Sequence, residues 1–214
     1  MAKQVAHEIK NPLTPMKLNL QYLQHLMKNN PDDFKEKFEK ASAGIIEQID
    51  SLANIANEFS SFAKFPKTNL QAINLSEIIK ISVLTFENYK NISINDSNLL
   101  NELFVLGDKD QALRVFNNIL KNAIQALDEV ADPKIEINAE VTETTIVVSI
   151  KDNGCGIHPE MKQKLFTPNF TTKTTGSGLG LAMVKNIMQG FDGKVWFDSE
   201  TGKGTCFYLE FHKA

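Results

Sequence analysis

A histidine and a glutamate stand next to each other at His7 and Glu8, in the stretch VAHEIKNPLTP. A carboxylate that hydrogen-bonds one imidazole nitrogen leaves the other nitrogen available as a nucleophile. Asn11 and Thr14 follow four and seven residues after the histidine, so a helix places all three on one face. Alone, this pattern is more often an ordinary surface histidine, and a nucleophile here needs a phosphoryl donor elsewhere in the chain.

Two asparagines lie four residues apart in NNILKNAIQAL, with Arg114 one turn before them. A helix places Asn118 and Asn122 on one face, and neutral amide oxygens can ligate Mg²⁺ beside phosphate oxygens. The alternative is a solvated helix face that happens to carry two asparagines.

The stretch DNGCGI directly follows a strand pattern. Asp152 at a strand end can accept a hydrogen bond from an exocyclic amine such as N6 of adenine. Gly154 and Gly156 allow a tight backbone turn and a close approach to a flat base. A simple hairpin turn, which D-N-G also favours, is the alternative.

A glycine-rich loop precedes an apolar helix, with Gly176, Gly178 and Gly180 in TTGSGLGLAMV. Backbone amides in such a loop, with a helix N-terminus behind them, can cradle phosphates. Lys173 precedes the loop and could reach a terminal phosphate. Phe166 and Phe170 lie just upstream in a threonine-rich segment, which suits a lid with apolar anchors.

The spacing of apolar residues differs between the first 65 residues and the rest of the chain, so the two parts should form different elements. Residues 1–65 contain no strand pattern, and their apolar positions predict two long helices joined by a short turn at NNPDDF, where Pro31 suits a first helical position. The first seam is Ile9, Leu13, Met16, Leu20, Leu23 and Met27. The second seam is Phe34, Phe38, Ala41, Ile45, Gln48, Leu52, Ile55, Phe59 and Phe62. Gln48 either fixes the register or reaches solvent.

A hairpin of this kind cannot bury both seams and their flanks alone, so dimerisation into a four-helix bundle is expected. Pro12 should kink or loosen the first helix at the turn that carries the histidine. Pro66 starts a linker over residues 66–69. Short strands, helices near 76–88, 108–128 and 180–190, and two strand pairs then predict an α+β region over residues 70–214.

The 214 residues carry a net charge of −3 and two cysteines. This composition predicts a globular protein of a reducing compartment, with no general nucleic-acid surface, disulfide framework or membrane segment. The sequence starts only six residues before His7, with helical patterning already under way, so we expect the cytoplasmic portion of a longer protein. An inner-membrane anchor in that parent protein stays open.

Taken in order, these motifs resemble the catalytic core of sensor histidine kinases over nearly the whole chain. HEIKNPLTP is similar to the H-box of the dimerisation and phosphotransfer (HisKA) domain. The stretches similar to the N, G1, F and G2 boxes of the ATP-binding (HATPase_c) domain are NNILKNAIQAL, DNGCGI, LFTPNF and GSGLGLAMV. TGKGT is similar to the last glycine motif. The resemblance implies a Bergerat-type α/β sandwich that binds ATP.

The resemblance also implies roles for individual residues. His7 would be the phosphoacceptor, and Glu8 the residue that activates it. Asn122 would be the main Mg²⁺ ligand, with Asn118 beside it. Further nucleotide contacts would come from Asp152, Gly154, Gly156, Lys173, Gly176, Gly178, Gly180, Leu181 and Thr205. Asp152 would bind the adenine amine, near Thr205.

The implied reaction is autophosphorylation of His7 by ATP, followed by transfer to an aspartate of a response-regulator receiver domain. Glu8 and Asn11 match the family's Glu-x-x-Asn phosphatase motif, so Asn11 would orient a water that dephosphorylates the regulator. Gln125 stands where many members have a lysine, as in the NtrY-like branch. Lys173 and Arg114 are then the candidate cations for the phosphates.

Two other functions stay open at this point. One is a dimeric ATPase of the same fold, and the other is a non-catalytic dimeric scaffold whose nucleotide site has decayed. The histidine–glutamate pair outside the nucleotide-binding region argues against the first. Every motif carries residue types that could bind a nucleotide, which argues against the second.

Overall fold

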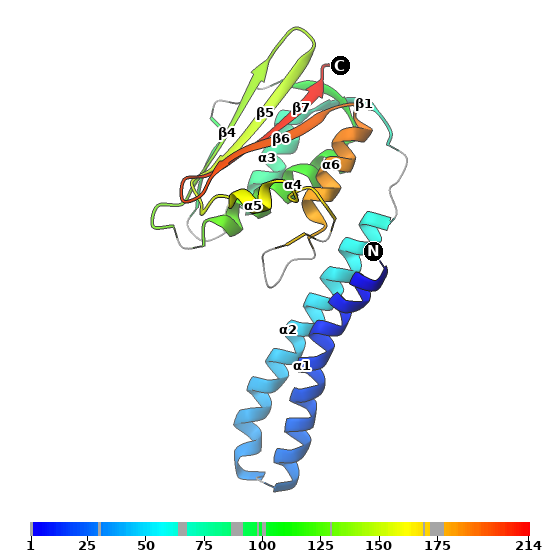
Figure 1. Cartoon of the computed structure of the whole chain (residues 1–214), viewed down its shortest axis with the longest axis vertical. Helices are drawn as coiled ribbons and strands as arrows, with labels where there is room; N and C mark the ends of the chain where they lie inside the picture. Colours follow the sequence, from blue (N-terminus) through cyan, green and yellow to red (C-terminus); the bar gives the residue numbers. More distant parts are fainter. Residues whose placement is uncertain are drawn as a thin grey trace. The chain divides into compact units, whose positions relative to one another are not determined.

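The computed structural model describes residues 2–29, 31–63, 68–86, 92–97, 99, 102–128, 130–168, 170–171 and 178–214. Side chains of residues 2–8, 29, 31–33, 35–36, 54 and 57–63 lie outside this description. The chain has a helical part and an α/β part, each described by itself below (Figure 1).

The helical part is an antiparallel hairpin of two long helices, α1 (Ala2–Asn29) and α2 (Pro31–Ala63). The second helix begins at Pro31, as predicted, because the ring of proline fits the first helical position. The first helix continues through Pro12 and Pro15 without ending. None of the described helices is long and apolar enough to span a membrane.

The face that α1 turns to α2 differs from the predicted seam. The buried stripe consists of Pro12, Met16, Leu23 and Leu26. The half-buried Asn19 lies along the same side of α1, and its Nδ2 lies 3.6 Å from the point where Gly44 of α2 would carry a Cβ. Of the six predicted seam residues only Met16 and Leu23 are buried.

The other four seam residues, Ile9, Leu13, Leu20 and Met27, are exposed, and Met27 is the most open at 60%. The hairpin of one chain therefore covers only one flank of α1, and burial of the whole seam in a dimer stays a prediction. In α2 most of the described seam residues, Gln48 included, are half-buried, while the flanking Ile46 and Ile49 are exposed. Several large apolar side chains of both helices thus remain uncovered on the isolated hairpin.

The α/β part contains the remaining elements in the order that the sequence predicts. The strands are β1 (Gln71–Asn74), β2 (Ser93–Asn95), β3 (Phe104–Gly107), β4 (Lys134–Val141), β5 (Thr145–Asp152), β6 (Lys194–Glu200) and β7 (Gly204–His212). The helices are α3 (Leu75–Phe86), α4 (Lys109–Ala126), α5 (Pro159–Lys162) and α6 (Gly180–Gly190). Only the one-turn helix α5 has no counterpart among the predictions.

Five strands form the main sheet in the order β2-β4-β5-β7-β6, with β2 parallel to β4 and all other pairs antiparallel. Strands β1 and β3 form a separate antiparallel pair. The helices α3, α4 and α6 cover one face of the main sheet (Figure 1). This is the two-layer α+β architecture that the sequence predicts.

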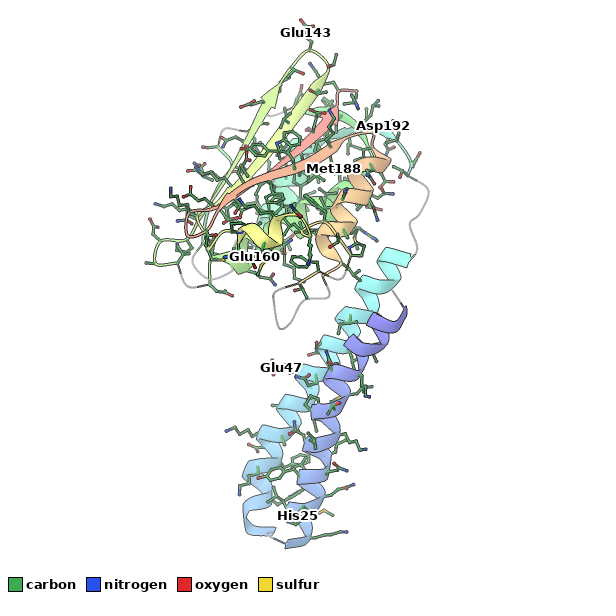
Figure 2. All side chains as sticks on the ribbon, in the orientation of Figure 1. His25, Glu47, Glu143, Glu160, Met188 and Asp192 are labelled. Atoms are coloured by element: carbon green, nitrogen blue, oxygen red, sulfur yellow. The ribbon has the colours of Figure 1, made fainter. Side chains whose placement is uncertain are left out.

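Alternation along the strands determines which side chains face the helices. On β5 the buried row is Ile146, Val148, Ile150 and Asp152, and on β7 it is Thr205, Phe207, Leu209 and Phe211. Phe116 of α4 stacks on Phe211 with ring centroids 6.2 Å apart, and Met188 of α6 is fully buried (Figure 2). The polar residues Asp152 and Thr205 therefore end two apolar rows that face the helical layer.

The helix α4 starts at a well-formed N-cap. Asp108 Oδ1 accepts hydrogen bonds from the backbone N–H groups of Asp110 and Gln111, both at 3.1 Å. Its other oxygen, Oδ2, accepts one from the backbone N–H of Asn69 at 3.3 Å. The capping aspartate thus ties the end of the predicted linker to the helix that carries the two asparagines.

Candidate active site

The predicted phosphoacceptor belongs to α1, and the side chains of His7 and Glu8 lie outside the described part. One turn further along, Asn11 is exposed. Thr14 is also exposed, and its hydroxyl donates a hydrogen bond to the carbonyl of Lys10 at 3.1 Å. The two described polar residues of the predicted face are therefore open to solvent.

Asn118 and Asn122 lie on α4 and are half-buried, while Arg114 is exposed. The Nδ2 of Asn118 donates to the carbonyl of Arg114 at 2.8 Å. Its Oδ1 lies 2.6 Å from the point where Gly180 would carry a Cβ, at the first residue of α6. A larger residue at 180 would make the Asn118 side chain shift, so this glycine lets the amide lie close to the start of α6.

The same face of α4 meets the DNGCGI loop one helical turn beyond Asn122. The carbonyl of Ala126 accepts a hydrogen bond from the Cys155 amide at 3.1 Å. A Cβ on Gly154 would lie 2.6 Å from that carbonyl oxygen. Positions 118, 122 and 126 share one helix face, so Asn122 lies between the start of α6 and the DNGCGI loop.

Asp152 organises the DNGCGI loop from the end of β5. It is buried, and its Oδ1 accepts hydrogen bonds from the amides of Gly154, at 2.9 Å, and Thr205, at 3.2 Å. The hairpin alternative for D-N-G is wrong, because β5 pairs with β4 and β7 and the chain continues from Asp152 to α5.

The glycines around Asp152 serve close backbone packing. Gly156 has φ +68°, and a Cβ there would lie 2.1 Å from the carbonyl oxygen of Glu200. Gly204 has φ +105°, and its Cβ would lie 2.0 Å from the carbonyl oxygen of Asp152. The structure thus shows Gly154 and Gly156 against protein backbone, where the sequence suggested room for a base. Gly204 was not predicted individually, although it lies inside the TGKGT motif.

A serine that the sequence analysis did not single out joins this loop to the β6–β7 turn. Ser199 Oγ accepts a hydrogen bond from the Ile157 amide at 2.8 Å and lies 2.9 Å from Thr205 Oγ1. The Lys162 ammonium of α5 donates to the Ser199 carbonyl. No spacing rule marks a serine inside a strand, so only the fold could have shown this contact.

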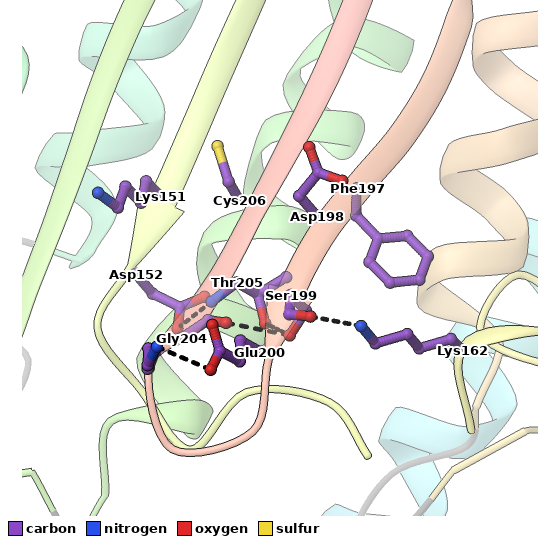
Figure 3. A pocket seen from close by; sticks show the side chains of 11 residues that line it. Lys151, Asp152, Lys162, Phe197, Asp198, Ser199, Glu200, Gly204, Thr205 and Cys206 are labelled. Carbon is purple, nitrogen blue, oxygen red and sulfur yellow. Dashed lines mark hydrogen bonds and ion pairs between the residues drawn. The ribbon is translucent and has the colours of Figure 1, made fainter. Parts of the chain in front are cut away.

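A cavity of about 530 Å³ opens where β5 ends beside the β6–β7 turn (Figure 3). Its lining is Lys151, Asp152, Lys162, Phe197, Asp198, Ser199, Glu200, Lys203, Gly204, Thr205 and Cys206. Phe166, one of the two predicted lid anchors, packs its ring against Phe197 with centroids 5.9 Å apart. The cavity therefore combines the predicted adenine-binding pair with charged side chains and an aromatic wall.

The thiol in this lining is not a nucleophile at neutral pH. Burial raises the pKa of Cys206, so the thiol stays protonated. Its hydrogen bond with Tyr208 is the main cause that raises the pKa of that tyrosine to about 12, and the charge of the Cys206 sulfur, burial and the charge of Asp198 add to it. Tyr208 in turn stacks on Trp196, with ring centroids 5.3 Å apart.

The remaining predicted nucleotide contacts are divided between described and undescribed positions. Lys173 and Gly176 lie outside the described residues. Gly178 has φ +64°, and Leu181 packs against the core from the first turn of α6. The structure thus brings Asp152, Thr205, Gly154 and Gly156 together in one cluster, and Asn118 and Gly180 in another.

Two family matches cover most of the chain. Residues 107–214 match HATPase_c, described as histidine kinase-, DNA gyrase B-, and HSP90-like ATPase. Residues 1–67 match HisKA, the His Kinase A (phospho-acceptor) domain. The chain belongs to the histidine kinase family. The observation that decides this is the presence of both matches in the order that the motifs predict.

Named relatives of this histidine kinase core align over nearly its full length. Nitrogen regulation protein NtrY of Azorhizobium caulinodans is 32% identical over 98% of this chain, and sporulation kinase A of Bacillus subtilis is 33% identical over 100%. A sensor histidine kinase of Rickettsia typhi, named NtrY-like, is 32% identical over 99%. These names support the NtrY-like branch predicted from Gln125. The chain spans about a third of the length of these relatives, 28%, 34% and 35% in turn.

Solved histidine kinases share the fold. The kinase ThkA in complex with the response regulator protein TrrA matches 100% of this chain and 61% of that chain, with 28% identity and a TM-score of 0.78. The isolated catalytic domain of ThkA matches 68% of this chain and 96% of that domain, with 34% identity and a TM-score of 0.60. The predicted fold class, a helical hairpin followed by an α/β ATP-binding domain, is confirmed.

Proposed function

We propose that this chain is an ATP-dependent protein-histidine kinase core that phosphorylates its own His7. One observation carries the proposal. The buried pair Asp152 and Thr205 is joined through the DNGCGI loop to the α4 face of Asn118 and Asn122. This cluster belongs to a chain whose first 67 residues match a phosphoacceptor domain.

The proposed step is an in-line phosphoryl transfer. A ring nitrogen of neutral His7 attacks the γ-phosphorus of ATP, a P–N bond forms, the bond to the β,γ-bridging oxygen breaks, and ADP leaves. Glu8 holds the proton on the other ring nitrogen, which keeps the attacking nitrogen unprotonated. The chain contributes mainly positioning and charge neutralisation, since this reaction needs little covalent assistance.

Each nucleotide residue has a proposed part. Asp152 accepts the adenine amine beside Thr205. Backbone amides around Gly178 and Gly180, together with Gly176 and Lys173, receive the phosphates at the start of α6. The half-buried amide of Asn122, with Asn118 beside it, suits Mg²⁺, which would neutralise phosphate charge when bound.

A homodimer is the proposed assembly. The exposed apolar residues Ile9, Leu13, Leu20 and Met27 on α1, with Ile46 and Ile49 on α2, would be covered in a four-helix bundle. We propose domain boundaries at residues 1–65 for the dimerisation and phosphotransfer hairpin, 66–69 for the linker and 70–214 for the ATP-binding domain.

The proposed partner is a response-regulator receiver domain that takes the phosphoryl group on an aspartate. ThkA, whose complex with TrrA matches this chain throughout, supports a partner of this class. Leu18 and Tyr22 continue the face of His7 and Asn11 along α1, and both are exposed, by 60% and 46%. These apolar side chains below His7 offer a docking surface for the regulator.

We also propose a second activity for this core. Asn11 supports phosphatase activity toward the same regulator, because it stands in the Glu-x-x-Asn pattern on the same face as His7.

We also propose that the chain is the cytoplasmic portion of a longer sensor protein, since its relatives are sensor kinases about three times its length. Membrane fractionation of the full-length protein tests this proposal, and recovery in the soluble fraction would exclude an anchor.

Labelling with γ-³²P-ATP tests the proposed kinase activity. Wild-type chain should take up acid-labile, base-stable label, and His7→Ala should take up none. His25→Ala is the matched control, because this histidine lies on the same helix five turns away and should not affect labelling. Asn122→Ala should weaken nucleotide binding and labelling together.

The outcomes separate the alternatives. Acid-labile label on His7→Ala contradicts the assignment of the phosphoacceptor. ATP hydrolysis without any label on the wild type indicates an ATPase of the same fold. Undetectable nucleotide binding, or binding that Asn122→Ala leaves unchanged, indicates a scaffold with a decayed site.

A further inference from the structure

Ser199 forms the centre of a hydrogen-bond cluster beside the proposed adenine site (Figure 3). Its Oγ has three partners: the Ile157 amide at 2.8 Å, the Gly204 carbonyl oxygen at 3.0 Å and Thr205 Oγ1 at 2.9 Å. A serine hydroxyl has one proton to donate and two lone pairs to accept with. Three partners therefore use its full capacity.

The nature of two partners determines the third bond. The Ile157 amide can only donate to Ser199 Oγ, and the Gly204 carbonyl can only accept from it. The single proton of Ser199 is thus directed to Gly204. The remaining bond must then run from the Thr205 hydroxyl to Ser199, so the proton of Thr205 is also engaged.

This arrangement determines the direction in which the Thr205 hydroxyl donates its proton. Because its proton points to Ser199, Thr205 Oγ1 presents lone pairs to the cavity that it lines. The neighbouring carboxylate of Asp152 is also an acceptor, and its Oδ1 binds the Thr205 amide. Two hydrogen-bond acceptors therefore stand side by side at this end of the cavity.

We infer that Ser199 is a positioning residue that makes the site selective for adenine over guanine, by holding the Thr205 hydroxyl as an acceptor. Adenine carries an amine donor at C6, which matches two acceptors, whereas guanine carries a carbonyl oxygen there. The inference rests on the proposed ATP-binding function. It assigns base discrimination to a residue that does not itself contact the base.

Substitution of Ser199 separates this role from simple stability. Ser199→Ala removes the acceptor for the Thr205 proton, so the hydroxyl can turn and donate to O6 of guanine. Ser199→Thr retains the hydroxyl and should restore the cluster. Ser149→Ala is the matched control, because Ser149 is equally half-buried in the same sheet but lies on the face of β5 opposite to Asp152.

The test measures ATP and GTP dissociation constants by calorimetry on the whole chain, with melting temperatures recorded for every variant. Ser199→Ala should lower the preference for ATP over GTP by about fivefold or more, the size of one neutral hydrogen bond. Ser199→Thr and Ser149→Ala should stay within about twofold of wild type.

An unchanged preference in folded Ser199→Ala, or equal losses for ATP and GTP, overturns the inference while the proposed kinase function stands. If Ser199→Ala does not fold, Thr205→Val in the wild-type background removes the Thr205 hydroxyl, the acceptor that Ser199 is proposed to orient, with little change of volume. An unchanged preference in that variant overturns the inference equally. A wild-type chain that binds no ATP overturns both the inference and the proposed function.

Discussion

Asp152 and Thr205 lie directly opposite each other on β5 and β7, and Asp152 Oδ1 accepts the Thr205 amide at 3.2 Å. The same oxygen accepts the Gly154 amide at 2.9 Å. One carboxylate oxygen therefore holds the DNGCGI loop and the last glycine motif together. Asp152 would therefore bind the base and also hold the backbone around its own carboxylate in place.

Asp152→Asn should separate these two roles. The amide retains an oxygen acceptor for both backbone N–H groups but replaces the second carboxylate oxygen by a donor. We expect a melting temperature close to that of the wild type and ATP binding weakened by about tenfold or more, the worth of a hydrogen bond to a charged group. Calorimetric titration and thermal melting on the same samples measure the two effects.

Asp152→Ala is the comparison for that experiment. It leaves two backbone donors without their acceptor in a buried site, which costs about 2–4 kcal/mol of the free energy of unfolding. If Asp152→Asn is destabilised as much as Asp152→Ala, the Oδ1 bonds do not hold the loop as the structure indicates.

The elements of the α/β part were predictable because each has a strong local signal. Alternating apolar residues predict β5 and β7, and the apolar face of α4 follows the helical period. The contact between α4 and the DNGCGI loop could not be predicted, since it depends on backbone packing at Gly154 against Ala126, residues 28 positions apart. Ser199 was missed for the same reason.

The hairpin shows a different limit of sequence reasoning. The apolar seam of α1 has the right period, but a period does not say which partner covers it. In one chain α2 covers Pro12 and Leu26, which the predicted seam did not contain, and leaves Leu13 and Leu20 exposed. A single hairpin covers one flank of the predicted seam, and the proposed dimer would cover the rest.

Leu20→Glu should convert the proposed dimer to monomers. Leu20 is 52% exposed in the single chain, and burial of each leucine in a dimer is worth about 1.5–3 kcal/mol. The substitution removes both copies of this leucine and places two carboxylates in the interface. We therefore expect the dimer dissociation constant to rise by about a hundredfold or more. Sedimentation velocity over a concentration series measures the change.

Leu18→Glu is the control for the dimer experiment. It makes the same chemical change two residues away, on the face of α1 that continues His7 and Asn11. This variant should sediment as the wild type does. A wild type that is already monomeric, or a Leu20→Glu protein as dimeric as Leu18→Glu, contradicts the proposed bundle.

Tyr208 should titrate near pH 12, well above an ordinary tyrosine, because its hydrogen bond with Cys206 disfavours the ionised form. The raised pKa means that the folded state holds this proton more tightly than the unfolded state does. Its stabilising effect is therefore complete below about pH 10 and is lost as the pH rises towards 12. Ionised tyrosine quenches tryptophan fluorescence, and Trp196, the single tryptophan, stacks on Tyr208 and reports the titration.

Cys206→Ala should lower the midpoint of that titration towards about pH 10. Cys206→Ser, which can still hydrogen-bond, should lower it less. Identical midpoints in the wild type and Cys206→Ala would show that the thiol is not the cause of the shift.

Asn11→Ala should slow dephosphorylation of the response regulator and spare autophosphorylation. The side chain is exposed on α1, so its removal opens no cavity, and alanine favours a helix more than asparagine does. A lost activity in this variant therefore cannot come from an unfolded helix. We expect dephosphorylation to fall by about tenfold or more, as for the loss of a group that positions a catalytic water. Label release from the phosphorylated regulator, measured beside γ-³²P-ATP labelling of the kinase, gives both rates.

Thr14→Ala, one turn further along the same face, is the control and should leave both rates unchanged. Equal losses of both activities in Asn11→Ala would argue against a separate phosphatase role for this asparagine.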